Sequence, residues 1–215
     1  MTIKIEEKIA AMPQFIYGET EINHLKSRDK ILGAAIDRIG FIERDVIPDI
    51  FSALVNSVVG QQISMKAWAT IWARMQDRLG GVTPQSICAA SIEDVQTCGV
   101  SNRKASYIKG IADKVVSGEL DVVTLDSMSD DEVCRTLTTL KGIGIWTAEM
   151  VMIFSMQRPD VFSWDDLAIH RALRLLYRHR VVTKKLFEKY RRRYSPYGTV
   201  ASLYLWEIAG GALED

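Results

Sequence analysis

Apolar residues recur along this chain at intervals of three and four, the spacing of a helix that buries one face. The stretch from Ile47 to Val59 shows this pattern most clearly. Its apolar residues share one face: Ile50, Phe51, Leu54, Val55, Val58 and Val59. The strict alternation that is typical of a strand is rare, so the pattern predicts an almost entirely helical, all-α protein.

Capping residues and glycines mark the ends of the predicted helices. Ser64 can cap a helix that runs to Leu79 and ends at Gly80-Gly81. Ser129 to Glu132 is a capping box that opens another helix. One or two helices are expected before residue 45, of which roughly 31–42 is the clearer. Further helices are expected to start at Thr83-Pro84, Ser91 and Ser101, and three more to cover roughly 166–178, 182–194 and 196–209.

A glycine-rich loop interrupts the helical pattern between Leu140 and Ala148, where the sequence reads LKGIGIWTA. Gly142 and Gly144 let the backbone turn through positive φ and let another backbone come close. The N–H groups at the start of the next helix, together with the helix dipole, form an anion site. The loop therefore predicts a tight hairpin between two helices that can hold a phosphate of DNA or RNA.

A second polar segment, WDDLAIHRAL, runs from Trp164 to Leu173 and opens another helix. Its paired acids are Asp165 and Asp166. Either can serve as the helix N-cap, and either can supply a carboxylate to a reaction that develops positive charge. Spacing alone divides the two roles evenly between them, although Asp165 comes first and suits the cap better.

The charge of the chain is balanced overall and uneven locally. The 215 residues have a formal net charge of zero, which argues mildly against a nucleic-acid partner. From Arg171 to Arg193, however, there are ten Lys or Arg and one acid, Glu188. Such a stretch alone is usually a solvated helix face. Close to the hairpin, it favours a surface that faces phosphates.

The three cysteines, Cys88, Cys98 and Cys134, lack the spacing of a metal site and are too few for a disulfide framework. We expect reduced, structural thiols. The sequence contains no signal-peptide pattern, no apolar run of membrane-spanning length, no glycine-rich nucleotide loop and no Ser-His-Asp candidate. These features predict a soluble, intracellular protein that does not associate with membranes.

The run LKGIGIWTA resembles the hairpin of the helix-hairpin-helix DNA glycosylase superfamily. The run DLAIHRAL from Asp166, about twenty residues further on, resembles the catalytic Asp motif of that superfamily. Both are most similar to the alkylation-repair branch, 3-methyladenine DNA glycosylase II, which shares the form G-x-G-x-W-T-A and the paired Asp. The resemblance extends from about residue 45 to 209.

This resemblance implies two helical lobes with the active cleft between them, in a single unit over residues 1–215. The chain ends, roughly 1–59 and 166–215, are expected to form one lobe. The middle, roughly 60–165, is expected to form the other and to contain the hairpin at 140–146. Some members of the branch carry an extra N-terminal β-rich domain, and this chain starts too close to the helical core to hold one.

The chemistry implied is hydrolysis of the N-glycosidic bond between a damaged base and deoxyribose. Asp166 matches the catalytic carboxylate, which leaves Asp165 as the cap. The bifunctional members carry a Schiff-base lysine two residues after the second hairpin glycine. This chain has Trp146 there, so water is the expected nucleophile and no lyase activity is expected.

The family flips the damaged base into an aromatic pocket, and aromatic faces attract the positive charge of alkylated purines. Trp146 and Trp206 match tryptophans of that pocket. The chain differs from the family member compared at Met150 and Leu167, where that member has Tyr, so its pocket is expected to be less aromatic. Trp164 could compensate, or it could pack within its loop.

The remaining assignments concern the grip on DNA. Gln62 matches the wedge that fills the hole left by the flipped base. The N–H groups of Gly142, Gly144 and Thr147 match the phosphate contacts, with Lys141 and Arg171 as nearby cations. At His170, phosphate contact or plain packing is expected. Carbonyls of Thr138, Leu140 and Ile143 match a monovalent-cation site for Na⁺ or K⁺. No cofactor is expected to be required, and the four-cysteine cluster of the iron–sulfur branch is missing from the sequence.

The sequence thus predicts a monofunctional base-excision repair glycosylase for alkylated purines (3-methyladenine, 7-methylguanine) in damaged double-stranded DNA. It is expected to act as a monomer without an obligate protein partner. In a prokaryote it would be cytoplasmic and nucleoid-associated. Two alternatives remain open: a non-catalytic helix-hairpin-helix protein that binds or senses damaged DNA, and a monofunctional glycosylase for deaminated or oxidised bases.

Overall fold

The computed structural model describes residues 13–214, and the regular secondary structure of this part consists of helices and an isolated bridge between Gln14 and Asp45. The all-α prediction is confirmed. In chain order the elements are α1 (Glu19–Arg28), α2 (Lys30–Ile39), α3 (Ile50–Gly60), α4 (Met65–Arg78), α5 (Pro84–Ala89), α6 (Ile92–Thr97), α7 (Asn102–Val116), the 3₁₀ helix η1 (Thr124–Ser127), α8 (Asp130–Leu137), α9 (Ile145–Phe154), α10 (Leu167–Tyr177), α11 (Lys184–Tyr194) and α12 (Gly198–Ala209).

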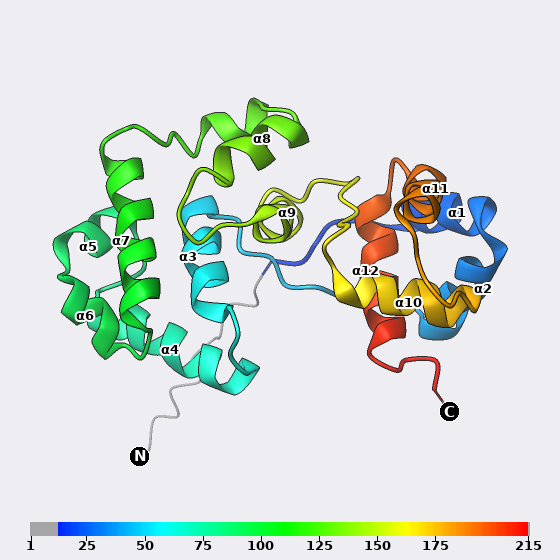
Figure 1. Cartoon of the computed structure of the whole chain (residues 1–215), viewed down its shortest axis with the longest axis horizontal. Helices are drawn as coiled ribbons and strands as arrows, with labels where there is room; N and C mark the ends of the chain where they lie inside the picture. Colours follow the sequence, from blue (N-terminus) through cyan, green and yellow to red (C-terminus); the bar gives the residue numbers. More distant parts are fainter. Residues whose placement is uncertain (1–12, 215) are drawn as a thin grey trace, which may run out of the picture.

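The helices pack into two groups (Figure 1). In one group, which we call the chain-end lobe, α12 packs against α10, α2, α1 and α11. This lobe contains both ends of the described chain. In the other group, the middle lobe, α7 packs against α3, α5 and α6, while α9 packs against α3 and α8. None of the helices of the described residues is long and apolar enough to cross a membrane.

Helix α3 belongs to the middle lobe and not to the lobe of the chain ends, where the sequence had placed residues up to 59. It packs against α4, α7 and α9. Seven of its residues are buried, so the helix is apolar around most of its circumference. Such a pattern predicts burial, but it cannot indicate which neighbours provide it.

The predicted helix starts agree with the structure because capping is local. The side chains of Ser64 and Ser101 accept hydrogen bonds from the first turns of α4 and α7. Ser129 forms the predicted capping box with Glu132 at the start of α8. The short helix η1 was not predicted, since four residues carry too little periodicity to be detected.

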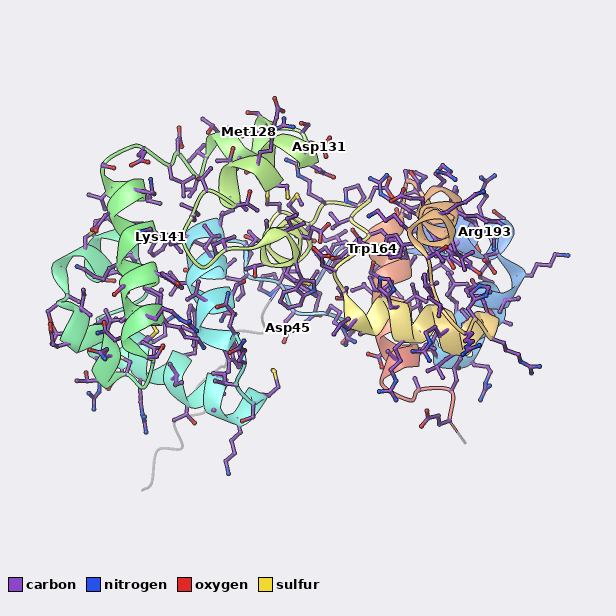
Figure 2. The ribbon with its side chains drawn as sticks, viewed as in Figure 1. Asp45, Met128, Asp131, Lys141, Trp164 and Arg193 are labelled. Carbon is purple, nitrogen blue, oxygen red and sulfur yellow. The ribbon has the colours of Figure 1, made fainter. Side chains whose placement is uncertain are left out.

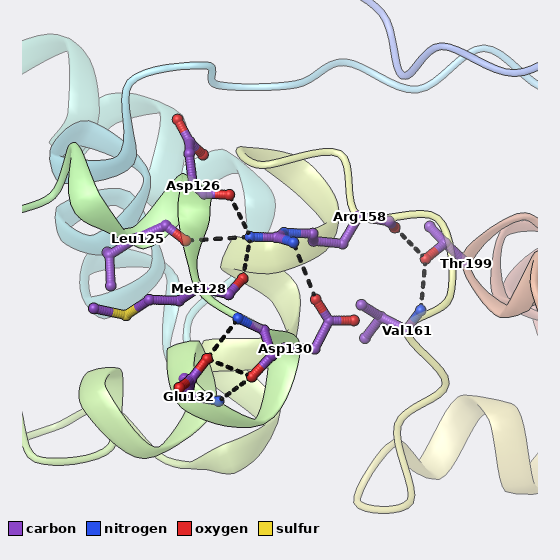
Figure 3. Close-up of polar contacts among 9 residues, drawn as sticks. Leu125, Asp126, Met128, Asp130, Glu132, Arg158, Val161 and Thr199 are labelled. Atoms are coloured by element: carbon purple, nitrogen blue, oxygen red, sulfur yellow. Dashed lines mark hydrogen bonds and ion pairs between the residues drawn. The ribbon is translucent and has the colours of Figure 1, made fainter.

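The segment between α9 and α10 is tied to both lobes through Arg158 (Figure 3). Its guanidinium forms an ion pair with Asp130, with 3.6 Å between Nη1 and Oδ1. Thr199 Oγ1 on α12 donates to the Arg158 carbonyl at 2.6 Å. Arg158 Nη2 also donates to three carbonyls of the middle lobe, those of Leu125, Asp126 and Met128, at 3.2, 3.1 and 2.9 Å. One residue thus anchors the chain where it crosses from one lobe to the other.

Candidate active site

A cavity of about 760 Å³ opens where the two lobes meet. The middle lobe supplies residues from α3, the α3–α4 turn, α4 and α9. The chain-end lobe supplies the start of α10 and Trp206 of α12. The lining residues are Asn56, Ser57, Gly60, Gln61, Gln62, Ile63, Met65, Trp68, Trp146, Met150, Phe154, Asp166, Leu167, Ala168 and Trp206. Most of this wall is apolar, and its one acidic side chain among the described residues is Asp166.

Asp166 uses its two carboxylate oxygens for different purposes. Oδ1 accepts hydrogen bonds from the backbone N–H groups of Ala168 and Ile169, at 2.8 and 3.0 Å, and so caps α10. Oδ2 accepts from the indole N–H groups of Trp146 and Trp206, at 3.0 and 3.1 Å. An ionised carboxylate is an acceptor only, so four N–H donors suit it and hold it in one orientation at the cavity wall.

The division of roles between the two acids is therefore wrong in one respect. Asp166 and not Asp165 is the N-cap of α10, while Asp165 is exposed. Capping and a role in the cavity had been treated as alternatives, but a carboxylate has two oxygens and can do both. Spacing along the chain could not show this, because the second oxygen is positioned by α9 and α12.

The predicted pocket residues Trp146, Met150, Leu167 and Trp206 all line the cavity. Two further aromatic residues line it that were not predicted, Trp68 and Phe154. The ring of Phe154 stacks on Trp206, with centroids 5.7 Å apart. Phe154 could have been found from the sequence, since it follows Met150 by one helical turn on α9. Trp68 carries no such signal.

Trp164 does not compensate for the missing tyrosines, because it lies outside the cavity. Its ring packs edge-on against His170 and Phe187, with centroids 4.7 and 5.1 Å away. The ammonium of Lys184 lies 4.4 Å from its ring centre. Of the two roles expected for Trp164, the structure therefore shows packing and not a place in the pocket. His170 likewise packs in this cluster and bonds the Trp164 carbonyl at 2.8 Å.

The α3–α4 turn presents Gln62 at the cavity wall. Gln62 is exposed, and its φ of 57° lies in the left-handed region. The preceding Gln61 donates through Nε2 to the carbonyl of Gly142 in the hairpin, at 2.8 Å. Lys104 Nζ on α7 donates to the carbonyls of Val59 and Gln61, at 2.9 and 2.6 Å. These bonds hold the turn against both α7 and the hairpin, while the side chain of Gln62 remains exposed.

Burial lowers the pKa of the Lys104 ammonium, and the like charge of Arg103 lowers it further. The two backbone carbonyls are oriented acceptors for this half-buried donor. Lys104 therefore acts as a support for the turn. It does not line the cavity.

The two hairpin glycines have different surroundings, and only Gly142 is required by the fold. Gly142 has a φ of 90°, and a Cβ there would lie 2.3 Å from Cδ2 of Tyr107 on α7. Gly144 has a φ of −92° and a ψ of 176°, which is ordinary extended backbone, and a Cβ there would meet nothing within 4 Å. The expectation that both glycines turn through positive φ is therefore wrong for Gly144.

Gly144 is the N-cap of α9, and no side chain caps this helix. The first amides of a helix have no partner within it. The hairpin thus presents backbone N–H groups at an open, exposed surface, and the exposed Lys141 lies in the same turn. Thr147 is buried, so its hydroxyl is not part of this surface.

The proposed cation ligands Thr138, Leu140 and Ile143 lie around the same turn. Thr138 is the C-cap of α8, where carbonyls lack helical partners. The Leu140 carbonyl accepts from the N–H of Ile143 at 3.1 Å and retains a second lone pair. Neutral carbonyl oxygens at a helix end fit a hard monovalent cation. Among the described residues, no cluster of His, Cys, Asp or Glu could hold a metal ion.

A second carboxyl, Glu149 of α9, is close to the Asp165–Asp166 pair. Its Oε2 and the hydroxyl of Ser163 are both buried, and neither atom has a hydrogen-bond partner among the described residues. Burial raises the pKa of the Glu149 carboxyl, and the negative charges of Asp165 and Asp166 raise it further. The Ser163 hydroxyl, which is close but outside hydrogen-bond geometry, and the charge of Lys184 offset this only in part. This residue was not singled out in the sequence, where it reads as an ordinary helical Glu.

The chain is similar to known base excision DNA repair proteins. The model of the HhH-GPD superfamily of base excision DNA repair proteins matches residues 55–196. DNA-3-methyladenine glycosylase 1 of Schizosaccharomyces pombe is 31% identical over 97% of this chain and 94% of its own length. DNA-3-methyladenine glycosylase 2 of Escherichia coli is 25% identical over 86% of this chain and 68% of its own length.

Solved structures agree with these sequence relationships. The crystal structure of a DNA-3-methyladenine glycosidase from Bacillus halodurans has a TM-score of 0.83 and 36% identity, and the match covers 95% of each chain. The 3-methyladenine DNA glycosylase of S. pombe, in complex with abasic DNA, has a TM-score of 0.78 and 30% identity, and the match covers 88% of this chain and 96% of the other.

Proposed function

Because the chain belongs to the HhH-GPD superfamily of base excision DNA repair proteins, we propose that it hydrolyses the N-glycosidic bond of alkylated purines in double-stranded DNA. The substrates would be bases such as 3-methyladenine and 7-methylguanine. The observation that carries this proposal is Asp166, a carboxylate held at the wall of an apolar, aromatic cavity between the lobes.

The reaction passes through a sugar that resembles an oxocarbenium ion, and a fixed anion beside that sugar lowers the barrier. Asp166 is such an anion. Its cap on α10 and its two indole partners hold it before substrate arrives, so little reorganisation is needed during the reaction. The same carboxylate can orient a water molecule or take a proton from it as that water attacks the sugar.

Alkylated purines carry positive charge, and the cavity offers them aromatic faces. Trp146, Trp206, Phe154 and Trp68 line it. A desolvated cation–π contact contributes roughly 2 kcal/mol. The volume of about 760 Å³ is in the range of small-molecule sites and accommodates a flipped purine with part of its sugar. Flipping costs a few kcal/mol, least for a damaged base.

Water is the proposed nucleophile, and the enzyme is proposed to be monofunctional. The position that would hold a Schiff-base lysine is occupied by Trp146, whose N–H bonds Asp166. No lysine is among the residues that line the cavity. Without a nucleophilic amine at the reacting carbon, no covalent intermediate forms that could lead to strand cleavage.

DNA would be held by the hairpin and by the α3–α4 turn. Backbone N–H groups of Gly142, Gly144 and Thr147 would bind a phosphate, with Lys141 as the nearby cation. Arg171, on α10 of the other lobe, would contact a different phosphate. Gln62 would enter the space left by the flipped base. Carbonyls of Thr138, Leu140 and Ile143 would hold a Na⁺ or K⁺ ion next to that phosphate. We propose that the protein works as an intracellular monomer and needs no other cofactor.

The rival function, binding of damaged DNA without catalysis, shares the hairpin but requires neither the cavity nor a carboxylate in it. The helix cap made by Asp166 does not favour this rival, because the cap uses only Oδ1 and leaves Oδ2 at the tryptophans. A glycosylase for deaminated or oxidised bases would share the whole site. Substrate profiling with hypoxanthine, uracil and 3-methyladenine duplexes separates that alternative.

The deciding experiment measures free base released from methylated duplex DNA by the wild type and by Asp166→Asn. Asn caps helices as well as Asp, so the substitution removes the charge and keeps α10 capped. We expect release of 3-methyladenine or 7-methylguanine to fall by about 100-fold or more while DNA binding is retained. Release of neither base by the wild type, with DNA binding intact, would contradict the proposal.

A further inference from the structure

A stripe of arginines on α10 leads away from the catalytic cavity. Leu167, Arg171 and Arg174 follow one another on α10 at intervals of four and three residues, and Arg178, the left-handed C-cap of the helix, follows four residues later. Residues at these intervals share one face of a helix. Leu167 is 84% exposed and lines the cavity, so the stripe begins where a flipped base would enter.

The charges of this stripe are not neutralised by the protein. Arg171, Arg174 and Arg178 are exposed, and none forms an ion pair within residues 13–214. Two other cations of the basic stretch do have acidic partners: Arg193 pairs with Asp29, and Lys184 pairs with Glu188. Unpaired arginines on one helix face suit an external anion with several charges.

Two hollows flank the stripe. One, of about 400 Å³, is lined by Leu167, His170, Arg174 and Arg180 among others, with Asp165 as its one acid. The other, of about 350 Å³, is lined by Arg171, Arg174, Leu175 and His179. Leu167 lines both the first hollow and the catalytic cavity, so the two are adjacent. Arg174 lies between the hollows and can reach into either.

We propose that this stripe binds the sugar–phosphate backbone of the DNA that flanks the flipped nucleotide. The proposal rests on the proposed function, and it extends the contact surface beyond the hairpin. From Arg171 to the C-cap residue Arg178 the last two turns of α10 advance about 10 Å, which is the axial length of about three successive phosphates of one strand. Three arginines on that length match the spacing of charge on the DNA.

The other basic surface of this lobe serves as a control. Arg28, Lys189, Arg192 and Arg193 line a separate hollow of about 350 Å³, which shares no residue with the catalytic cavity. Figure 2 shows Arg193 in the chain-end lobe, far from Lys141 in the hairpin. A duplex engaged at the cavity and the hairpin does not need this surface.

The test compares the full-length wild type with Arg174→Gln/Arg178→Gln and with Arg28→Gln/Arg192→Gln. Gln keeps a polar terminal group and much of the helix propensity of Arg, and it removes the charge. Binding to undamaged duplex is titrated over a series of salt concentrations. For the α10 pair we expect the slope of log K against log salt to become shallower by roughly 1.8, and affinity near 0.1 M salt to fall by about tenfold or more. For the control pair we expect neither change.

Base release under single-turnover conditions at saturating enzyme provides the second readout. We expect the α10 pair to match the wild type there, because the charges hold DNA and do not touch the reacting atoms. An unchanged salt slope for the α10 pair, or an equal loss of affinity in the control pair, would overturn the proposal that the stripe binds DNA. If the wild type releases no base but the α10 variant still binds DNA more weakly than the control variant, the proposed function fails while the proposed role of the stripe in DNA binding is supported.

Discussion

Trp146 on α9 and Trp206 on α12 lie in different lobes, yet both donate their indole N–H to the same oxygen of Asp166. The carboxylate is therefore oriented by both lobes at once. Its geometry depends on the lobes keeping their relative position, to which the Arg158 contacts contribute. This relationship makes the two indole N–H groups the first place to test how the site is organised.

Trp206→Phe removes one of these donors and keeps an aromatic ring that can stack on Phe154. A hydrogen bond to a charged group contributes about 1.5–3 kcal/mol, so we expect base release to slow by about 10- to 100-fold. The rate of base release under single-turnover conditions measures this effect. Trp164→Phe is the matched control, since that ring packs outside the cavity, and its rate should stay within about twofold of the wild type. Equal rates for Trp206→Phe and wild type would mean that the indole N–H does not organise Asp166.

The hairpin glycines allow stability and DNA contact to be separated. Gly142→Ala places a methyl group against Tyr107 at a positive φ, so we expect the free energy of unfolding to fall by about 1–3 kcal/mol. Gly144→Ala meets open space at an ordinary φ, so the fold should be unaffected. The added methyl group would nevertheless obstruct a phosphate at the N-terminus of α9. We expect about tenfold weaker duplex binding with unchanged thermal unfolding. Normal binding by Gly144→Ala would argue against a phosphate there.

Asp29 repeats the geometry of Asp166 in a purely structural setting. Its Oδ1 caps α2, and its Oδ2 accepts from Tyr177 and from Arg193, at 2.8 and 2.6 Å. Asp29→Asn keeps the cap and removes the charge that faces Arg193. We expect the free energy of unfolding at pH 7 to fall by about 2–3 kcal/mol, with little change in the base release of the folded enzyme. Asp166→Asn should show the reverse: a large loss of base release with little change in the free energy of unfolding.

The stability difference at Asp29 should depend on pH. Burial raises the pKa of the Asp29 carboxyl, but the bonds from Arg193, Leu32 and Tyr177 outweigh burial and hold it below the ordinary 3.8. A lowered pKa stabilises the fold fully above the unfolded value, and this contribution is lost as the pH falls through the folded value. Denaturant titrations of wild type and Asp29→Asn should therefore converge below about pH 3.8. A constant difference from pH 7 to pH 3 would contradict this.

Glu149 should show the opposite dependence. Its pKa is raised above the ordinary 4.5, so the folded state favours the proton, and stability is lost as the pH rises through the folded value. Glu149→Gln removes that loss. We expect a higher melting temperature than wild type at pH 8 and no difference below about pH 4.5. Exposed Glu43→Gln is the control and should change neither. A lower melting temperature for Glu149→Gln at pH 8 would show that the charged carboxylate has an unseen partner.

Most of the secondary structure and part of the site could be predicted from the sequence, because they depend on neighbouring residues. A Ser at a helix start satisfies an N–H three residues away, and an apolar face repeats every three or four residues. The hairpin between α8 and α9 and the helix that begins after Asp166 follow from the same local rules. The resemblance to a known family then connected these two segments to one chemistry.

Tertiary structure alone decided which segments meet. It placed α3 with the middle lobe, brought Trp68 to the cavity, and left Trp164 outside it. It also gave Asp166 two roles, because one oxygen faces its own helix while the other faces indoles that lie 20 and 40 positions away in the chain. Local sequence determines how a helix begins and which face is apolar. The partner of that face is determined by packing across the whole chain, where contacts between distant segments contribute most of the stability.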